Sequence, residues 1–160
     1  MTPRERWLSA LKCEPVDNIP FWPKLDSAYV PYQEEPYKSM SIDDLHKYVG
    51  SDQHIGISGC IKTIRKETSI KSTHTNGTMK IIYETPIGTL SATNRFDPIS
   101  HSWHPTEFPI KTKDDIRIMK AFVLDATDEP DEVQVEQANA TIKKIGEEAI
   151  TATGIGVSPL

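Results

Sequence analysis

Residues 149–157 read AITATGIGV, an apolar and β-branched run that predicts a strand buried on both faces of a parallel sheet. The residues just before it, 130–146, predict a helix with one apolar face and a stop at Gly146. The apolar positions of that helix are Val135, Ala138, Ile142 and Ile145. Parallel strands need helical crossovers, so this stretch predicts an α/β architecture.

The N-terminal third alternates helices with short apolar segments. A helix is predicted over residues 3–12, because Thr2 can cap it and Pro3 fits its first position. Residues 19–25 form an apolar segment punctuated by prolines, which we interpret as the first barrel strand. A second helix is predicted over 41–49. These elements continue the α/β pattern.

Two further segments complete the first third. Residues 27–40 have neither helical nor strand periodicity and contain two prolines, which indicates a long loop. Residues 52–58 predict a second short barrel strand. Long loops inside compact domains are often functional, so the residues that enter 27–40 are of interest.

The middle of the chain changes to a period of two. Residues 63–96 contain β-rich runs on both sides of Asn76-Gly77, which supplies the positive φ angles of a two-residue hairpin turn. This pattern predicts an antiparallel β-meander inserted between barrel units. Residues 97–110 are predicted to be irregular, and a helix is predicted over 113–125.

The order of these elements favours the N-terminal portion of a (β/α)8 TIM-type barrel with an inserted antiparallel meander. A complete barrel takes ~250 residues, so the 160 residues could supply only about its first half. We expect residues 1–160 to form a single domain, a partial barrel.

Composition excludes several classes of function. The formal net charge is -5 and the basic residues form no stripe, so nucleic acid is not expected as a partner. No apolar run approaches the ~20 residues of a membrane helix, and the charged N-terminus differs from a signal peptide. Cys13 and Cys60 lack zinc-site spacing and fit a reducing compartment. A cytoplasmic location is therefore expected.

Four stretches together resemble the uroporphyrinogen decarboxylase family and its methyltransferase relatives. They are TPRERWLSAL at 2–11, NIPFW at 18–22, ETPIGTL at 84–90 and GIGVSPL at 154–160. The resemblance implies a barrel of roughly twice this length, with the active site at the C-terminal ends of the strands.

Two departures separate the chain from true decarboxylases. In the family, two arginines after the first strand grip substrate carboxylates, but residues 23–29 read PKLDSAY and contain no arginine. Gly59 stands where the family places an aspartate at the end of the second strand. The resemblance is therefore closer to the corrinoid methyltransferase-like branch. That branch implies a zinc held by a His-x-Cys…Cys set in the later half of the protein, and a corrinoid partner.

Five residues are candidates for substrate binding because they lie on or just after predicted barrel strands. They are Trp22, Lys24, Asp26, Tyr29 and His54. A solvated loop anchored by aromatic side chains explains Lys24, Asp26 and Tyr29 about as well, and a core or rim histidine is commoner than a ligand-binding one. His101 and His104 could face one metal only on a helix, which Pro98 and Pro105 disfavour, so no metal site is predicted in this chain.

The leading hypothesis is an N-terminal fragment of a uroporphyrinogen-decarboxylase-like corrinoid/thiol methyltransferase, inactive by itself because the zinc ligands are missing. Its partners would be a small-molecule substrate and a corrinoid protein. One alternative is a decarboxylase of uroporphyrinogen or another small acid. Another is a non-enzymatic binding module that forms homo-oligomers through an open sheet edge. The catalytic residues are not assigned.

Overall fold

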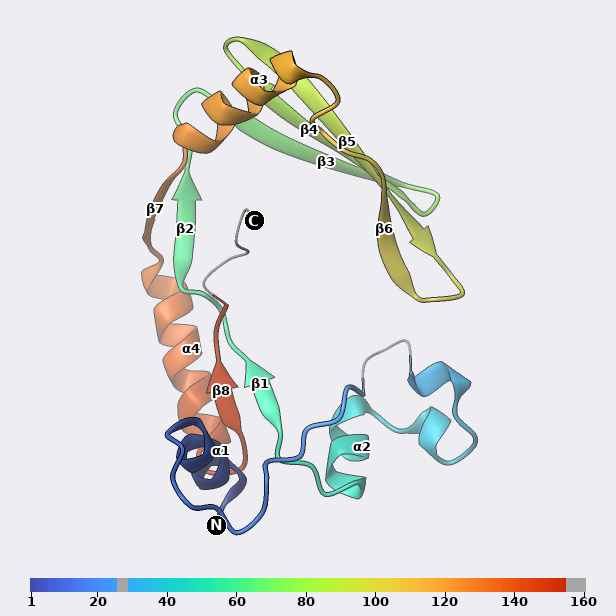
Figure 1. Ribbon diagram of the computed structural model, residues 1–160, viewed down its shortest axis with the longest axis vertical. Helices are drawn as coiled ribbons and strands as arrows, with labels where there is room; N and C mark the ends of the chain where they lie inside the picture. Colours follow the sequence, from blue (N-terminus) through green and yellow to red (C-terminus); the bar gives the residue numbers. More distant parts are fainter. Residues whose placement is uncertain (26–28, 155–160) are drawn as a thin grey trace. The chain divides into compact units, whose positions relative to one another are not determined.

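A computed structural model describes residues 1–25 and 29–154 of the chain. The protein is mixed α/β and divides into two compact units, which we describe separately (Figure 1). Unit 1 comprises Met1–Ile61 and Pro130–Leu160, and unit 2 comprises Lys62–Glu129. That residues 1–160 form a single domain stays a prediction.

The helices of unit 1 begin where capping residues predict. Helix α1 spans Pro3–Leu11, α2 spans Ile42–Tyr48 and α4 spans Glu132–Ile145. Thr2 and Glu5 form the expected capping box, and the Ser41 hydroxyl accepts a hydrogen bond from the Asp44 amide at 3.1 Å. Gly146 ends α4 at a φ of 55°. These features confirm the predicted starts of α1 and α2 and the predicted end of α4.

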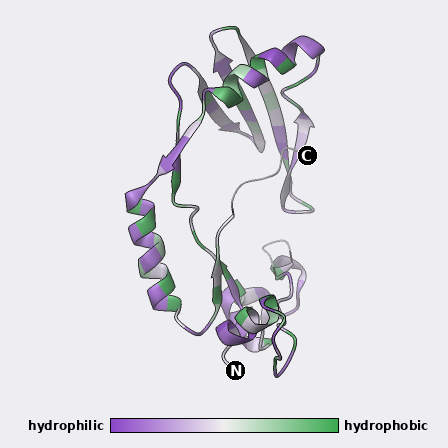
Figure 2. Ribbon diagram, turned by 60° about the vertical axis from the view of Figure 1, so that its left-hand side comes forward, coloured by the Kyte–Doolittle hydropathy of each residue, from purple (hydrophilic) through white to green (hydrophobic). Residues whose placement is uncertain are grey.

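Helix α4 starts two residues later than predicted. Residues Thr127–Pro130 form a strand, β7, and Asp131 is the N-cap. Figure 2 shows an apolar stripe along one side of helix α4. Ala138 is buried on that stripe, while Ile142 is 39% exposed.

Two short strands of unit 1 confirm the predicted parallel pairing. Strand β1, His54–Gly56, pairs with β8, Ile150–Ala152, in parallel register from His54–Ile150 to Gly56–Ala152. Both strands are shorter than predicted, and residues 155–157 of the expected last strand lie outside the described residues. Helix α1 packs against β8.

The predicted strand over residues 19–25 is wrong. The segment is extended, but it pairs with no strand of the described chain because Pro20 and Pro23 have no amide hydrogen to donate. The backbone of Phe21 instead attaches this segment to Asp52. Its carbonyl accepts from the Asp52 amide at 2.7 Å, and its amide donates to the Asp52 carboxylate at 3.0 Å. The predicted loop contains two short 3₁₀ helices, η1 (Val30–Tyr32) and η2 (Tyr37–Ser39).

Unit 2 contains the predicted antiparallel meander. Its strands, in the order β3-β4-β5-β6, are Ser69–Thr75, Thr78–Thr85, Gly88–Asp97 and Ser102–Glu107. The turn at Asn76-Gly77 has φ angles of 46° and 69°, which confirms the predicted hairpin. The expectation that residues 97–110 are irregular is wrong for residues 102–107, because β6 pairs with β5 through a bulge that accommodates Pro105. A separate pair joins β2, Ile61–Ile64, to β7.

Helix α3, Lys113–Leu124, covers one face of the meander sheet (Figure 1). Phe122 is buried there, and its ring meets the edge of the Tyr83 ring at 5.0 Å. Leu90 and Ala92 of β5 are the other buried apolar residues of this unit. The small core therefore lies between α3 and the middle strands.

No barrel closes among the strands that the structure describes. The α/β class is thus confirmed, whereas the TIM-type barrel stays a prediction. Within the described residues, no helix is long and apolar enough to cross a membrane.

Candidate functional site

A buried carboxylate holds the N-terminal segments of unit 1 together. Asp52 is 6% exposed, and one of its carboxylate oxygens accepts from the Arg6 guanidinium. Arg6 also binds both carboxylate oxygens of Asp17, with Nε at 2.7 Å and Nη2 at 3.0 Å. Hydrogen bonding to Arg6 and to the N-terminal ammonium holds the pKa of Asp17 well below its usual range.

The same carboxylate fixes the segment that leads into the candidate site. Asp52 accepts from the Phe21 amide, and its backbone carbonyl accepts from the Trp7 indole at 2.9 Å. A paired and hydrogen-bonded buried charge is costly to disturb. These contacts therefore position the adjacent Trp22 at the start of strand β1.

A pocket of about 620 Å³ opens beside β1, entirely within unit 1. This volume is in the range of small-molecule sites, ~300–1,000 Å³. Its lining comes from the segment after Phe21, from helix α2 and from β1. The lining residues are Trp22, Pro23, Lys24, Leu25, Ile42, Asp43, His46, Gln53, His54, Ile55 and Gly56.

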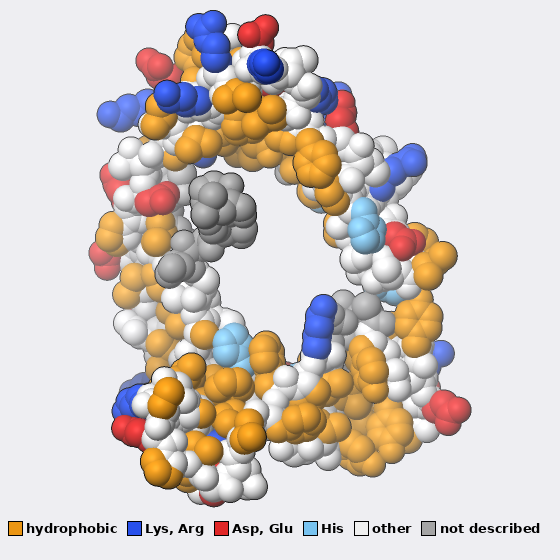
Figure 3. Space-filling model, in the orientation of Figure 1, with side chains coloured by type: hydrophobic (Ala, Val, Ile, Leu, Met, Phe, Trp, Pro, Cys, Tyr) orange, Lys and Arg blue, Asp and Glu red, His pale blue; other side chains and the backbone are white. Residues whose placement is uncertain are grey.

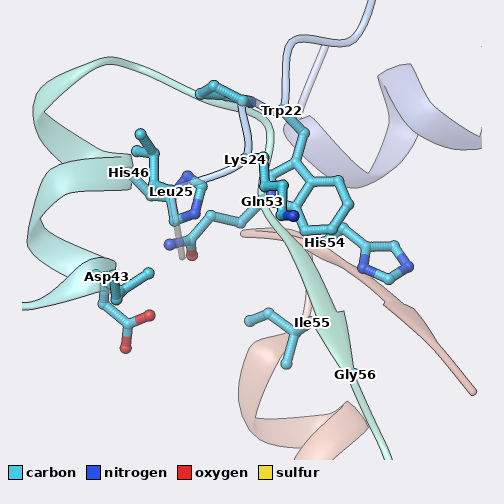
Figure 4. Close-up of a pocket in the computed structure, with 11 residues that line it drawn as sticks. Trp22, Lys24, Leu25, Asp43, His46, Gln53, His54, Ile55 and Gly56 are labelled. Atoms are coloured by element: carbon cyan, nitrogen blue, oxygen red, sulfur yellow. The ribbon is translucent and has the colours of Figure 1, made fainter. Parts of the chain in front are cut away.

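Three of the five predicted binding residues meet in this pocket: Trp22, Lys24 and His54. The centroids of the Trp22 and His54 rings lie 4.6 Å apart, with the ring planes tilted by 40°. Figure 4 shows the two side chains next to each other. Trp22 is 45% exposed, so the stack leaves much of the indole accessible. The pocket thus combines an aromatic surface, an imidazole and an ammonium group.

Two further polar side chains approach from the other side of β1. Gln53 extends toward His46 of helix α2, whereas His54 points away, because successive side chains of a strand alternate (Figure 4). His46 is 7% exposed and its Nδ1 lies 2.7 Å from the Ser51 hydroxyl. This arrangement can hydrogen-bond a small polar ligand.

The other two predicted residues are Asp26 and Tyr29. Asp26 lies outside the described residues. Tyr29 lines a separate pocket of about 220 Å³ with Tyr37 and Tyr48. The hydroxyls of Tyr37 and Tyr48 lie 2.9 Å apart, and this hydrogen bond raises the pKa of Tyr37.

Sequence reasoning missed His46, Gln53 and Asp43 as pocket residues, and Asp52 as their support. Gln53 could have been found from its place beside His54 in a predicted strand. Nothing in the sequence indicates that the middle of helix α2 faces that strand, because the contact depends on the path of residues 19–25. The role of Asp52 depends on Arg6, which lies far away in the sequence.

The described residues contain no group of three His, Cys, Asp or Glu side chains that could hold a metal ion. His101 lies in a turn at a φ of 49°, and His104 lies on β6, where its Nε2 is 2.9 Å from the Ser102 hydroxyl. The two histidines therefore do not share a helix. Zinc has no fitting ligand set within the described part of the chain.

We compared the chain with protein-family models, curated proteins and solved structures, and none of them matches.

Proposed function

We propose that unit 1 contributes a small-molecule binding site to a cytoplasmic, uroporphyrinogen-decarboxylase-like methyltransferase built on a (β/α)8 barrel. The chain supplies early barrel elements and part of the substrate pocket. The enzyme would move methyl groups between a small substrate, a corrinoid protein and a thiol. The single observation that supports this proposal best is the meeting of Trp22, Lys24 and His54 in one pocket beside β1.

The strand arrangement of unit 1 supports the proposal. The parallel pair of β1 and β8 is the arrangement that a barrel requires, and helix α4 precedes β8 as a crossover helix would. The tether through Arg6 and Asp52 fixes the residues that enter the pocket. Barrel enzymes support their ligand-binding segments in this way with rigid elements.

Ligand binding can be tested on these 160 residues by NMR. The chain has three tryptophans, and the indole N–H signal of Trp22 is identified by its loss in Trp22→Phe. Titration with small thiols and small carboxylic acids is expected to move the Trp22 signal and leave Trp103 unmoved. His54→Ala should weaken binding about tenfold, equivalent to about 1.4 kcal/mol. Tyr29→Phe is the matched control, because Tyr29 lines another pocket.

Methyl transfer is tested separately on the polypeptide to which these residues belong. It is incubated with methylcobalamin, zinc and several thiols, and the methylated thiol is measured by mass spectrometry. No step of this reaction is assigned to residues of this chain, because the described residues do not fit a zinc ion. Absence of product with every thiol would contradict the methyltransferase proposal. Formation of coproporphyrinogen from uroporphyrinogen would instead favour the decarboxylase alternative.

A second candidate function is an oligomerising module. Within the described residues, no third strand pairs with β1 or β8, so both outer edges of this sheet are open. Such edges can pair with a second copy of the chain. Sedimentation equilibrium tests this candidate, and a monomer across the accessible concentration range would exclude it.

A further inference from the structure

The apolar face of the meander sheet extends beyond the helix that covers it. Tyr83 and Leu90 are directly opposed on β4 and β5, and Phe122 of α3 packs against this part of the face. Phe96 lies an even number of residues after Leu90 on β5 and therefore faces the same side. It is directly opposed to Trp103 on β6. Figure 3 shows hydrophobic side chains that gather beneath α3 and continue along the sheet.

Three rings form a cluster at the hairpin end of this face. The His74 ring meets Trp103 edge to face at 5.8 Å and 88°, and Phe96 meets Trp103 at 5.5 Å and 56°. These contacts fix the orientation of the indole, since edge-to-face and tilted arrangements are the favourable ones. Trp103 is nevertheless 42% exposed and Phe96 is 37% exposed. The cluster therefore presents an oriented aromatic surface to solvent.

A polar rim borders this surface. The β3–β4 turn contributes Thr75, Asn76, Gly77 and Thr78 to a pocket of about 380 Å³ that the three rings also line. The turn is held by the Gly77 carbonyl, which accepts from the Phe96 amide at 2.8 Å. Such a rigid turn presents hydroxyl and amide groups in a fixed arrangement, which lowers the entropy lost on binding.

The lining also limits the charge of a ligand. None of the described residues that line this pocket is Lys, Arg, Asp or Glu, and His74 is the one titratable group among them. A nucleotide would bring phosphates that need cationic partners. A neutral ring with an apolar face and hydroxyl groups at its edge matches the indole and the polar rim.

We propose that the aromatic cluster of His74, Phe96 and Trp103 at the hairpin end of unit 2 binds a neutral saccharide. One sugar ring stacks its C–H face on the Trp103 indole. Its hydroxyl groups exchange hydrogen bonds with Asn76 and the threonines of the turn. This site is independent of the pocket beside β1, because all its residues belong to unit 2.

The test uses the whole 160-residue chain and three neutral probes: maltohexaose, cellohexaose and chitohexaose. Tryptophan indole signals are followed by NMR during titration, with an oligogalacturonate as the charged control. At least one neutral probe is expected to move the Trp103 signal in a saturable way, while the charged control moves it at least tenfold less at equal concentration. No shift of Trp103 with any neutral probe overturns the proposal, as does a stronger response to the charged control.

Three variants separate recognition from folding, and binding to the two Trp103 variants is followed through the backbone amide signal of Gly77 because their indole signal is lost. Trp103→Ala should weaken binding at least tenfold, and Trp103→Phe should retain most of it because a ring is preserved. Asn76→Asp keeps a residue suited to the turn but removes the amide donor, so a three- to tenfold weakening is expected. Amide signals of Leu90 and Ala92 report whether the sheet is intact. Unchanged binding in a folded Trp103→Ala variant also overturns the proposal.

Discussion

Unit 2 is built from segments that follow one another along the chain, whereas unit 1 joins segments from both ends of it. The meander of unit 2 consists of successive hairpins closed by α3. In unit 1, β1 pairs with β8, although all residues of unit 2 lie between these two strands in the sequence. The difference shows that local turns specify the meander, while the sheet of unit 1 depends on contacts that no short window of sequence contains.

The two units also differ in what they bury. Unit 2 buries Leu90, Ala92 and Phe122 between the sheet and the helix. Unit 1 likewise buries apolar side chains, and each unit buries polar ones: His46 and Asp52 in unit 1 and Thr68 in unit 2. Asp52 is the charged residue among them, so a buried, hydrogen-bonded carboxylate distinguishes unit 1 from unit 2.

The largest effect is expected from Phe122→Ala. Truncation of this buried ring removes its contact with Tyr83 and leaves a cavity, so unit 2 should lose about 4 kcal/mol of unfolding free energy. Urea unfolding followed through the Trp103 signal measures the loss. Leu124→Ala, in the same helix but 72% exposed, should change stability by less than about 0.5 kcal/mol. Equal effects of both variants would contradict a core at this position.

A smaller effect is expected from Asp52→Ala in unit 1. The change leaves the Phe21 amide without its acceptor and removes the buried partner of the Arg6 guanidinium, which keeps Asp17; the loss should cost about 3 kcal/mol. The Trp7 indole signal should shift, while the Trp103 signal should stay. Glu148→Ala is the control, because Glu148 is exposed. A tolerated Asp52→Ala change would show that the tether does not organise the unit.

Gly88→Ala tests the approach of α3 to the sheet. Gly88 has a φ of 151°, and a Cβ there would lie 2.6 Å from Cδ1 of Ile118. The strained backbone and the displaced isoleucine should together cost about 2 kcal/mol, measured by thermal unfolding. Gly56→Ala is the matched change in unit 1, since a Cβ there meets nothing within 4 Å. A larger loss of stability in Gly56→Ala than in Gly88→Ala would contradict the close approach of α3 to the sheet at Gly88.

The smallest effect is a difference in how pH and salt act on the units. The Thr68 hydroxyl, with neighbouring backbone amides, lowers the pKa of Asp125 in unit 2, and Arg6 lowers that of Asp17 in unit 1. A lowered folded-state pKa means that each carboxylate stabilises its unit above the ordinary value of about 3.9. This stability is lost as the pH falls from there through the lowered pKa.

Added salt should affect the stability contributions of the two carboxylates differently. Asp17 is held by cations, so added salt should weaken its contribution, whereas Asp125 is held by neutral donors and should respond little. Unfolding curves from pH 7 to about pH 2, recorded at low and high salt through Trp7 and Trp103, measure both effects. Asp125→Asn should remove most of the acid sensitivity of unit 2 attributable to this group. Equal salt dependence in both units would contradict the assignment.

The local features of the fold could be predicted from the sequence. Thr2 and Ser41 identify two helix starts, and Asn76-Gly77 identifies the hairpin, because each depends on residues a few positions away. Strand β6 could not be predicted, since Pro105 argues against a strand unless a bulge is present. The segment 19–25 had the composition of a strand but lacked the amide donors to pair as one.

The candidate site was predictable only in part. Trp22, Lys24 and His54 were found because each lies within a predicted barrel strand. His46 was missed because its place in the pocket results from the tertiary path around Asp52. Whether these residues bind a substrate stays a prediction that the titration described above decides.

The pairing of His54 with Ile150 has a consequence for biosynthesis. Strand β1 leaves the ribosome early, but its partner strand is made only after the meander, α3 and α4. Hairpins form quickly because they join neighbouring segments, so the meander can fold while β1 is still unpaired. We therefore expect the ends of the chain to assemble last, around a middle that is already formed.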